Sequence, residues 1–271
     1  MDSLVSLQKS KPTNLVQAIE RASSILDVLG KNPHGISVRE LSAQVGLPKG
    51  TTHRLLSSLT YFGYAQQDAK TRHYSLGFKL VELGNRLLNQ LDLRTEAKPF
   101  LTDLSKRTQE TVHLVILDKN EVLYIDKVES NDNPSGLRMA SRVGSRTPAH
   151  SCAVGKALLA HFSEEELDKF IKDTGLPKMT ENTITDPILL KEHLRLVRSQ
   201  GYVVDDEENE KGIRCVAAPI RNEVGMVIAA TSISGPAIRI TKKKIQESLK
   251  DEIIETTSKI SWKLGFRKEG Q

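Results

Sequence analysis

A run of basic and small polar residues between positions 49 and 57 is the part of the sequence best suited to contact another molecule. Arg54 can donate two N–H bonds to a guanine or a phosphate, and Lys49 and Thr51 can reach phosphates or base edges. Such residue types at the start of a helix suit the major groove of DNA. The predicted DNA contacts are Ser37, Lys49, Gly50, Thr51, Thr52, His53, Arg54, Ser57, Lys70 and Arg72.

Two short helices are expected to position this run. Ser37 and Glu40 have the S-x-x-E spacing of a capping box, which predicts the start of the first helix. Gly46 can take the left-handed conformation that ends this helix, and Pro48 can stand at the entry to the next one. The second helix is predicted over residues 49–61, and its buried stripe consists of Thr52, Leu55, Leu56 and Leu59.

An earlier helix completes the unit. Its apolar face is predicted from spacings of three and four residues at Leu15, Ile19, Ala22, Leu26 and Leu29. A longer helix followed by two short helices around a glycine turn is typical of a helix-turn-helix. The alternative is a helical hairpin whose polar face contacts only solvent.

A β-hairpin is predicted after the third helix. Two strand-like segments at 64–67 and 73–76 flank a polar turn at 68–72. In a winged helix-turn-helix this hairpin is the wing, and Lys70 and Arg72 at its tip could touch the DNA backbone or minor groove. The alternative is an ordinary surface hairpin.

The positive charge of the chain is unevenly distributed. The formal net charge is +5, and residues 1–91 account for all of it, with 11 Lys and Arg against 6 Asp and Glu. Residues 92–271 hold 28 of each kind. A basic block joined to a neutral one indicates a polyanion-binding module attached to a different domain.

A leucine-rich helix is predicted between the two blocks, over residues 77–93. Its apolar face is larger than a free linker needs, so we expect it to pack against a partner chain. Helix-turn-helix proteins usually bind paired half-sites as dimers, so a homodimer or a dimer of dimers is predicted.

The remainder of the chain mixes helices and strands. Strands are predicted over 112–117, 121–128, 137–141, 202–204, 213–220 and 226–232. Helices are predicted over 94–108, 150–161, 164–172, 187–200 and 241–264. Because hairpins join consecutive strands directly, the fold class is α+β, with an antiparallel sheet and flanking helices.

At this point the chain resembles the IclR family of bacterial transcription regulators. In the first block the resemblance rests on LSAQVGLPKGTTHRLL at 41–56. In the second block it rests on PAHSCAVGKA at 148–157, on GY at 201–202 with DDEE at 205–208, on GIRCVAAPI at 212–220 and on SISGP at 232–236. These segments follow the family's order and span nearly the whole chain.

The resemblance implies a DNA-binding regulator, usually a repressor, whose operator affinity is controlled by a small organic acid. It implies a winged helix-turn-helix over 1–77, a linker helix over 78–92 and a GAF-like effector-binding domain over 93–267. The effector would be a keto acid or a sugar acid. An aromatic acid, or the same architecture acting as an activator, stays open.

The resemblance also carries over the lining of an effector pocket. The implied residues are Met139, Thr147, Ala153, Val154, Asp205, Cys215, Ser232 and Ser234. Ala153 and Val154 would offer backbone N–H groups near a helix start, where a carboxylate is favoured. Ser232 and Ser234 alternate on a strand, so both hydroxyls face one side. For Cys215 the alternative is a small buried hydrophobe.

Other classes of function have weaker support. An enzyme would need Cys152 or Cys215 as a nucleophile with His150 or His113 as a base, and no nucleophile elbow or phosphate loop is present. A nucleotide-binding signalling domain lacks a Gly-rich phosphate cradle. No cofactor or metal is predicted, because the spacing of His150, Cys152, Asp205 and Cys215 does not require one. With no signal peptide and no long apolar run, we expect a cytoplasmic protein without a membrane partner.

Overall fold

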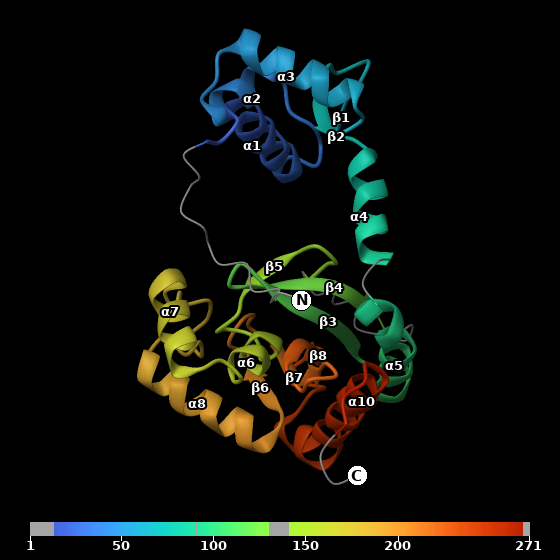
Figure 1. The fold of residues 1–271 in the computed structure, drawn as a ribbon, viewed down its shortest axis with the longest axis vertical. Helices are drawn as coiled ribbons and strands as arrows, with labels where there is room; N and C mark the ends of the chain where they lie inside the picture. Colours follow the sequence, from blue (N-terminus) through green and yellow to red (C-terminus); the bar gives the residue numbers. More distant parts are fainter. Residues whose placement is uncertain (1–13, 90–91, 130–140, 268–271) are drawn as a thin grey trace. The chain divides into compact units, whose positions relative to one another are not determined.

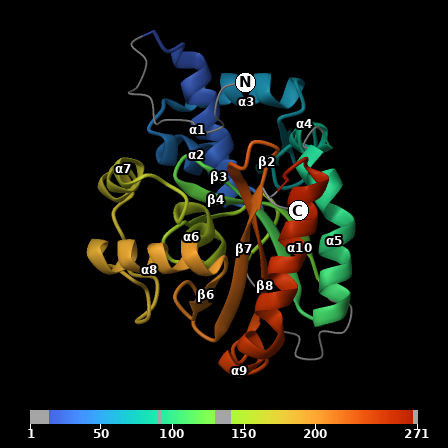
Figure 2. The same cartoon turned by 60° about the horizontal axis from the view of Figure 1, so that its bottom comes forward.

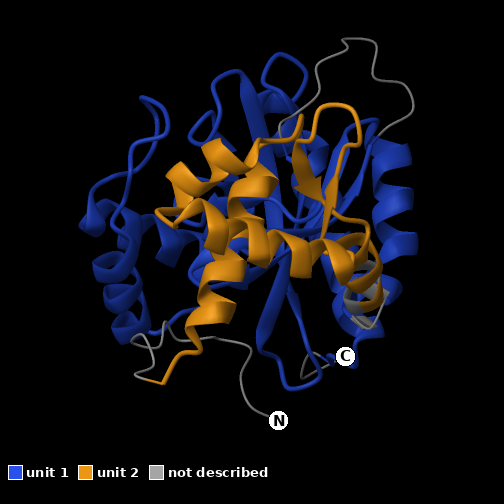
Figure 3. Cartoon of the chain, turned by 90° about the horizontal axis from the view of Figure 1, so that it is seen from above, with its two compact units in different colours: residues 1–7, 92–271 blue, residues 8–91 orange. Residues whose placement is uncertain are grey.

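The computed structural model describes residues 14–89, 92–129 and 141–267 (Figure 1). These residues fall into two compact units, which divide at residues 91 and 92 and are coloured separately in Figure 3. None of the described helices is long and apolar enough to cross a membrane.

The first unit begins with the three predicted helices. They are α1 (Gln17–Lys31), α2 (Val38–Val45) and α3 (Lys49–Tyr61). The capping box at the start of α2 is present, and Gly46 ends that helix with a φ of 65°, in the left-handed region. Pro48 is the N-cap residue of α3, directly before Lys49. The predicted helix-turn-helix is therefore confirmed, together with the residues that start and end its helices.

The buried face of α1 differs from the predicted stripe. Ile25 and Leu29 are the buried residues of this helix, whereas Ile19 is 69% exposed and Leu15 precedes the helix. Ala22 and Leu26, both predicted, are partly buried against the core, whereas the first turn of α1, residues 17–20, is exposed. The core of the unit consists of Ile25, Leu29, Ile36, Leu41, Leu56, Leu59, Ala65 and Tyr74.

The predicted wing is an antiparallel hairpin of β1 (Ala65–Gln67) and β2 (Tyr74–Leu76). Its turn is organised by Asp68, whose carboxylate accepts hydrogen bonds from the backbone N–H groups of Lys70 and Thr71 at 3.0 and 2.7 Å. Helix α4 (Lys79–Asn89) follows and groups with this first unit.

The second unit is built on a six-stranded antiparallel sheet in the order β5-β4-β3-β8-β7-β6. The strands are β3 (Thr111–Asp118), β4 (Glu121–Val128), β5 (Arg146–Pro148), β6 (Val203–Asp206), β7 (Ile213–Arg221) and β8 (Val227–Pro236). The predicted α+β class with an antiparallel sheet is confirmed.

Helices cover both faces of this sheet (Figure 2). One face carries α5 (Asp92–Thr108) and a C-terminal helix made of α9 (Lys242–Lys244), a π-helical turn (Ile245–Leu249) and α10 (Lys250–Lys263). The other face carries α6 (Ala153–Leu159), which packs against β7 and β8. Helix α8 (Pro187–Gln200) covers α6, and α7 (Glu164–Thr174) joins the same core.

Two predicted elements of this unit are wrong or untested. Most of the strand predicted over 137–141 lies outside the described residues, among which β5 is the edge strand next to β4. Helix α6 begins at Ala153 and not at His150, because residues 149–152 form a turn. That turn passes so close to Gly155 that a Cβ there would lie 2.1 Å from the carbonyl oxygen of Ala149.

Candidate functional site

The outer face of α3 is open to solvent. Of the predicted DNA contacts on this helix, Lys49, Gly50, His53, Arg54 and Ser57 are exposed and Thr51 is half-buried. These residues stand opposite the buried positions of the same helix, so one side of α3 packs and the other is free.

The basic side chains of this face are free to pair with a ligand. Neither Lys49 nor Arg54 forms an ion pair with any residue in the described part of the chain. The Ser57 hydroxyl donates to the His53 carbonyl at 2.9 Å and keeps its acceptor capacity. The face can therefore offer a planar guanidinium and an ammonium group to phosphates or base edges without breaking an internal contact.

Two predicted contact residues have structural roles. Thr52 is 0% exposed, and its hydroxyl donates to the Pro48 carbonyl at 3.2 Å, so its inclusion among the DNA contacts was wrong. Position 52 faces the core because it lies one turn before Leu56. The Ser37 hydroxyl donates to the Glu40 carboxylate at 2.7 Å and accepts from its backbone N–H, so Ser37 fixes the start of α2. Hydrogen bonds from Ser37 lower the pKa of Glu40.

The tip of the wing carries the remaining predicted contacts. Lys70 and Arg72 are both exposed, and Arg72 adopts a φ of 60° in the turn that Asp68 stabilises. Hydrogen bonds to Asp68 fix the backbone of this turn, while its two basic side chains are exposed to solvent.

A separate cavity of about 150 Å³ lies in the second unit. Every predicted effector residue that the structure describes lines it: Thr147, Ala153, Val154, Asp205, Cys215, Ser232 and Ser234. Met139 lies outside the described residues. A cavity of roughly this volume accepts a molecule about the size of benzene, so it suits a small organic ligand.

The register of the sheet brings the polar lining together. Ser232 on β8 stands opposite His113 on β3, and Ser234 stands opposite Cys215 on β7. Asp205 on β6 stands opposite Cys215 in turn. Four strands thus place these side chains in two neighbouring rows of the sheet, one with His113 and Ser232 and one with Ser234, Cys215 and Asp205. Cys152, Ala153 and Val154, at the start of α6, complete the lining.

His113 is a lining residue that the sequence did not assign to the pocket. Its Nδ1 atom lies 3.3 Å from the Ser234 hydroxyl and 3.4 Å from the Ser232 hydroxyl, and its Nε2 atom lies 2.9 Å from the Ser141 hydroxyl. Burial and the nearby positive charge of Lys127 lower the pKa of His113 to about 3, so the ring is neutral. The two serine hydroxyls are 3.0 Å apart.

Asp205 is a buried carboxyl at the opposite wall. It is 2% exposed, and burial raises its pKa to about 7 despite the charge of Lys156 and the N–H groups of Glu208 and Asn209. Its Oδ1 atom accepts from the Glu208 N–H at 2.7 Å. Near neutral pH a large fraction of Asp205 is protonated, so it can donate a hydrogen bond to an anionic ligand.

A buried ion pair supports this wall from behind. Lys156 on α6 is fully buried and pairs with Glu208 in the loop after β6, and its ammonium group also donates to the Val204 carbonyl at 3.2 Å. The hydroxyls of Thr180 and Thr183 bind the carbonyls of Glu207 and Glu208 at 2.7 and 2.6 Å. The loop that carries Asn209 and Glu210 into the cavity is therefore fixed from several sides.

The two thiols of the cavity are poor nucleophiles. Burial raises the pKa of Cys152 to about 12, and it raises that of Cys215 well above its usual range. His150 is outside the cavity lining, and its Nε2–H donates to the Pro177 carbonyl at 3.0 Å. Among the described residues, no three His, Cys, Asp or Glu side chains group as a metal site. The cavity is suited to binding a polar ligand by hydrogen bonds.

The signal for His113 and Tyr124 was present in the strand pattern. Both lie beside buried residues on predicted strands, but from the sequence His113 is assigned only a possible role as the base of an enzyme. The Tyr124 ring packs edge-on to the His113 ring, with centroids 5.2 Å apart. Ser145, Arg146, Asn209 and Glu210 lie in loops and β5, where no periodicity points to a shared face.

Two sequence families match the chain in order. The helix-turn-helix domain of the IclR family matches residues 18–69, and the family described as the bacterial transcriptional regulator IclR C-terminal domain matches residues 85–262.

Curated relatives match nearly end to end. The HTH-type transcriptional regulator KdgR of Escherichia coli is 38% identical over 94% of this chain and 95% of its own length. The transcriptional repressor IclR of E. coli is 35% identical over 87% of this chain and 85% of its own length. The repressor AllR of Salmonella typhimurium is 38% identical over 93% and 91%.

Solved structures agree with the sequence matches. The Thermotoga maritima IclR structure has a TM-score of 0.76 and 39% identity, covering 92% of this chain and 98% of that one. An IclR homologue from Microbacterium hydrocarbonoxydans, solved in complex with 4-hydroxybenzoate, has a TM-score of 0.79 and 26% identity over 92% and 99% of the two chains.

Proposed function

Because the chain belongs to the IclR family of bacterial transcriptional regulators, we propose that it is a repressor whose affinity for its operator is set by a small organic acid bound in the cavity of the second unit. The chain is a DNA-binding transcriptional regulator and not an enzyme. Named repressors among its relatives support the negative sign of regulation.

The exposed face of α3 supports the proposed DNA contacts. Arg54 is the residue we assign to a base edge or phosphate, because its guanidinium is exposed and unpaired in the described part of the chain. Lys49 and Thr51 would contact phosphates at the start of the helix, and Lys70 and Arg72 would contact the backbone beside the groove.

One observation carries the effector proposal: the predicted pocket residues meet in one cavity although they come from four strands and a helix start. The lining combines the Ser232 and Ser234 hydroxyls with a neutral His113 and a readily protonated Asp205. Such groups can donate to a carboxylate and its hydroxyl or keto oxygens. The charged Arg146 is already paired with Asp118, so hydrogen bonding would dominate recognition.

A keto acid or a sugar acid fits this lining better than an aromatic acid does. The wall is rich in hydroxyl and carboxyl groups, which can bind the keto or hydroxyl oxygens that a plain aromatic ring lacks. The 4-hydroxybenzoate complex of the Microbacterium homologue is the observation that favours the second candidate, an aromatic acid.

A homodimer or a dimer of dimers belongs to the same proposal. Paired half-sites about one helical turn apart need two helix-turn-helix units. The linker helix of the proposed division 1–77, 78–92 and 93–267 would carry the response between domains. The acid shifts operator affinity only by its differential affinity for the two states of the protein.

A thermal screen tests the effector proposal. We would add pyruvate, gluconate and benzoate to the full-length protein and measure the melting temperature. A bound acid at about 100 times its Kd adds about 2.7 kcal/mol to stability. The double variant Ser232→Ala/Ser234→Ala should lose the shift. A shift that survives in this variant, or no shift with any acid, would contradict the proposal.

DNA binding is tested separately. We would select an operator from random-sequence DNA with the protein and then measure the Kd at increasing salt. Specific binding that weakens steeply with salt is expected, because phosphate contacts release counterions. If no sequence is enriched and no salt-sensitive binding is found, the proposed α3 surface is wrong.

A further inference from the structure

A second open groove lies at the far end of β7. Strand β6 pairs with residues 214–217 of β7, so residues 218–221 have β8 on one side only and form an edge. The groove runs along this edge and the last turns of α10. It is lined by Gly201, Pro219, Arg221, Ile254, Thr257, Ser258, Ser261, Trp262, Phe266 and Arg267. Pro219 has no N–H, so this edge lacks one of the donors that strand addition would use.

Two arginines face this groove without a carboxylate partner among the described residues. Arg221 donates to the Gly225 carbonyl at 2.9 Å and lies 3.4 Å from the His161 ring nitrogen. Arg267 donates to the carbonyls of Trp262 and Phe266 at 2.8 and 3.0 Å. A guanidinium has five N–H donors, so most of the donor capacity of both remains.

The surroundings of Arg221 add positive potential. Burial and the neighbouring Arg198 lower the pKa of Arg221, and Arg198 itself donates to the carbonyls of Ala160 and Phe162. Burial and these two arginines also lower the pKa of His161 to about 4, so His161 brings no second charge of its own. Glu223 lies beside Gly265 and pairs with neither groove arginine.

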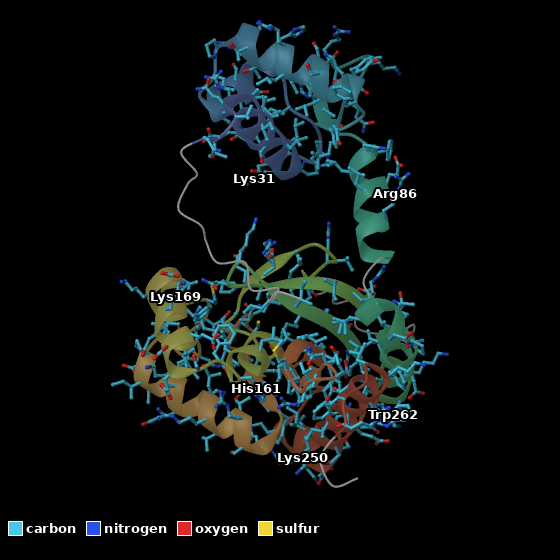
Figure 4. All side chains as sticks on the ribbon, viewed as in Figure 1. Lys31, Arg86, His161, Lys169, Lys250 and Trp262 are labelled. Carbon is cyan, nitrogen blue, oxygen red and sulfur yellow. The ribbon has the colours of Figure 1, made fainter. Side chains whose placement is uncertain are left out.

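The rest of the groove is apolar or neutral. Trp262 is 60% exposed, and the Arg267 guanidinium lies 4.4 Å from the centroid of its ring. Ile254, Pro219 and Phe266 extend the apolar wall, and the exposed Ser258 hydroxyl has no hydrogen-bond partner in the described part of the chain. Figure 4 labels Trp262 on α10 and His161 in the segment just after α6.

This groove is distinct from the effector cavity. The two share no lining residue, and β7 contributes to both, with Ile213 and Cys215 at one end and Pro219 and Arg221 at the other. The two sites therefore lie at opposite ends of one continuous strand.

We propose that this groove is a second ligand site, independent of the effector cavity, which takes a small free carboxylate carried on an aromatic ring or short apolar chain. The carboxylate pairs with Arg221 and Arg267, and the apolar body lies against Trp262 and Ile254. A planar carboxylate matches the guanidinium fork, and a flat ring matches the exposed indole.

The chain provides its own probe, because Trp262 is its single tryptophan. We would titrate the full-length protein with benzoate and hexanoate and record its fluorescence, using benzyl alcohol as a neutral control. A saturable change with benzoate that benzyl alcohol does not produce is expected. Arg267→Gln should weaken it at least fivefold, and Arg221→Gln should do the same if the variant melts as the wild type does.

Matched variants decide between the sites. Ser232→Ala/Ser234→Ala, in the effector cavity, should leave the benzoate titration within twofold. A response that this variant abolishes, or that Arg267→Gln leaves unchanged, overturns the second site. A fluorescence change on protein dilution without ligand shows that a second copy covers the groove, which also overturns it. The absence of any response to benzoate and hexanoate does the same.

Discussion

The two functional regions of this regulator hold their polar groups in opposite ways. On α3, Lys49 and Arg54 are exposed and form no ion pair within the described chain, so water solvates them until DNA arrives. In the cavity of the second unit, Asp205 and His113 are buried and their pKa values are shifted far towards the neutral form. The first region is a surface of exposed charges, unpaired among the described residues, whereas the second is a buried site held together by hydrogen bonds and ion pairs.

This difference explains how each region is expected to respond to change. Exposed charges contribute little to folding, so the α3 face can be altered with a loss of binding and a small loss of stability. Buried polar groups depend on one another, so a change near the cavity affects folding and ligand recognition together. The predictions below test that contrast.

The largest effect is expected at the buried ion pair. Lys156→Met leaves Glu208 buried without its partner, which should lower the free energy of unfolding by about 3–5 kcal/mol. Trp262 lies in the same unit, so urea unfolding followed by its fluorescence measures the loss. Lys156→Met combined with Glu208→Leu should recover most of the stability. If the single variant is as stable as the wild type, the pair does not support the cavity wall.

The DNA surface should give the reverse result. Arg54→Ala should weaken binding to the selected operator by roughly 10- to 100-fold, because a bidentate contact to a base is worth about 1–3 kcal/mol. Its free energy of unfolding should stay within about 0.5 kcal/mol of the wild-type value. Arg195→Ala, an exposed arginine of the second unit, is the matched control and should change operator affinity less than twofold. Equal losses of operator affinity in both variants would mean that the exposed face of α3 is not the DNA-binding surface.

The protonation of Asp205 provides a smaller effect that depends on pH. Its folded pKa of about 7 is higher than the unfolded value of about 4, so the folded state holds the proton more tightly. Its contribution to stability is therefore full below about pH 4, declines as the pH rises towards about 7, and is level above that.

Asp205→Asn isolates this contribution, since the amide keeps an acceptor for the Glu208 N–H and cannot ionise. Between pH 5 and pH 8 the variant should gain at least about 1.4 kcal/mol relative to the wild type, which corresponds to one pKa unit. Urea unfolding followed by Trp262 fluorescence at both pH values is the measurement. A constant difference between the two proteins would mean that Asp205 is ionised throughout.

The smallest effect is expected at the start of α2. Ser37→Ala removes a helix cap and should cost about 1 kcal/mol of stability in the first unit, with operator affinity falling only as far as α2 frays. Amide hydrogen exchange in α2 is the measurement, and Ser24→Ala, at an exposed position of α1, is the control. A large loss of operator binding with unchanged exchange would assign Ser37 a direct DNA contact.

The sequence predicted the helix-turn-helix well because local chemistry determines it. Ser37, Glu40 and Gly46 specify where α2 starts and stops without help from distant residues. The face of α1 was less predictable, because Leu15 and Ile19 continue the apolar spacing but extend past the helices that form the core. Thr52 was assigned to both faces of α3, and only packing shows that it belongs to the core.

The cavity shows the limit of prediction from spacing alone. Resemblance to a family supplied Asp205, Cys215, Ser232 and Ser234, whereas alternation explained only the shared side of the two serines. His113 joins them through the register of β3 against β8, which no local pattern specifies. The buried partnership of Lys156 with Glu208 joins residues 52 positions apart, so it too depends on tertiary structure.

The central claim is that occupancy of the cavity changes operator affinity, and a single anisotropy titration tests it. The Kd of the full-length protein for its selected operator would be measured with and without a saturating amount of the acid whose thermal shift depends on Ser232 and Ser234. We predict a change of at least about fivefold, and the operator should change the Kd of the acid by the same factor. An operator Kd that stays the same at saturation would contradict the account.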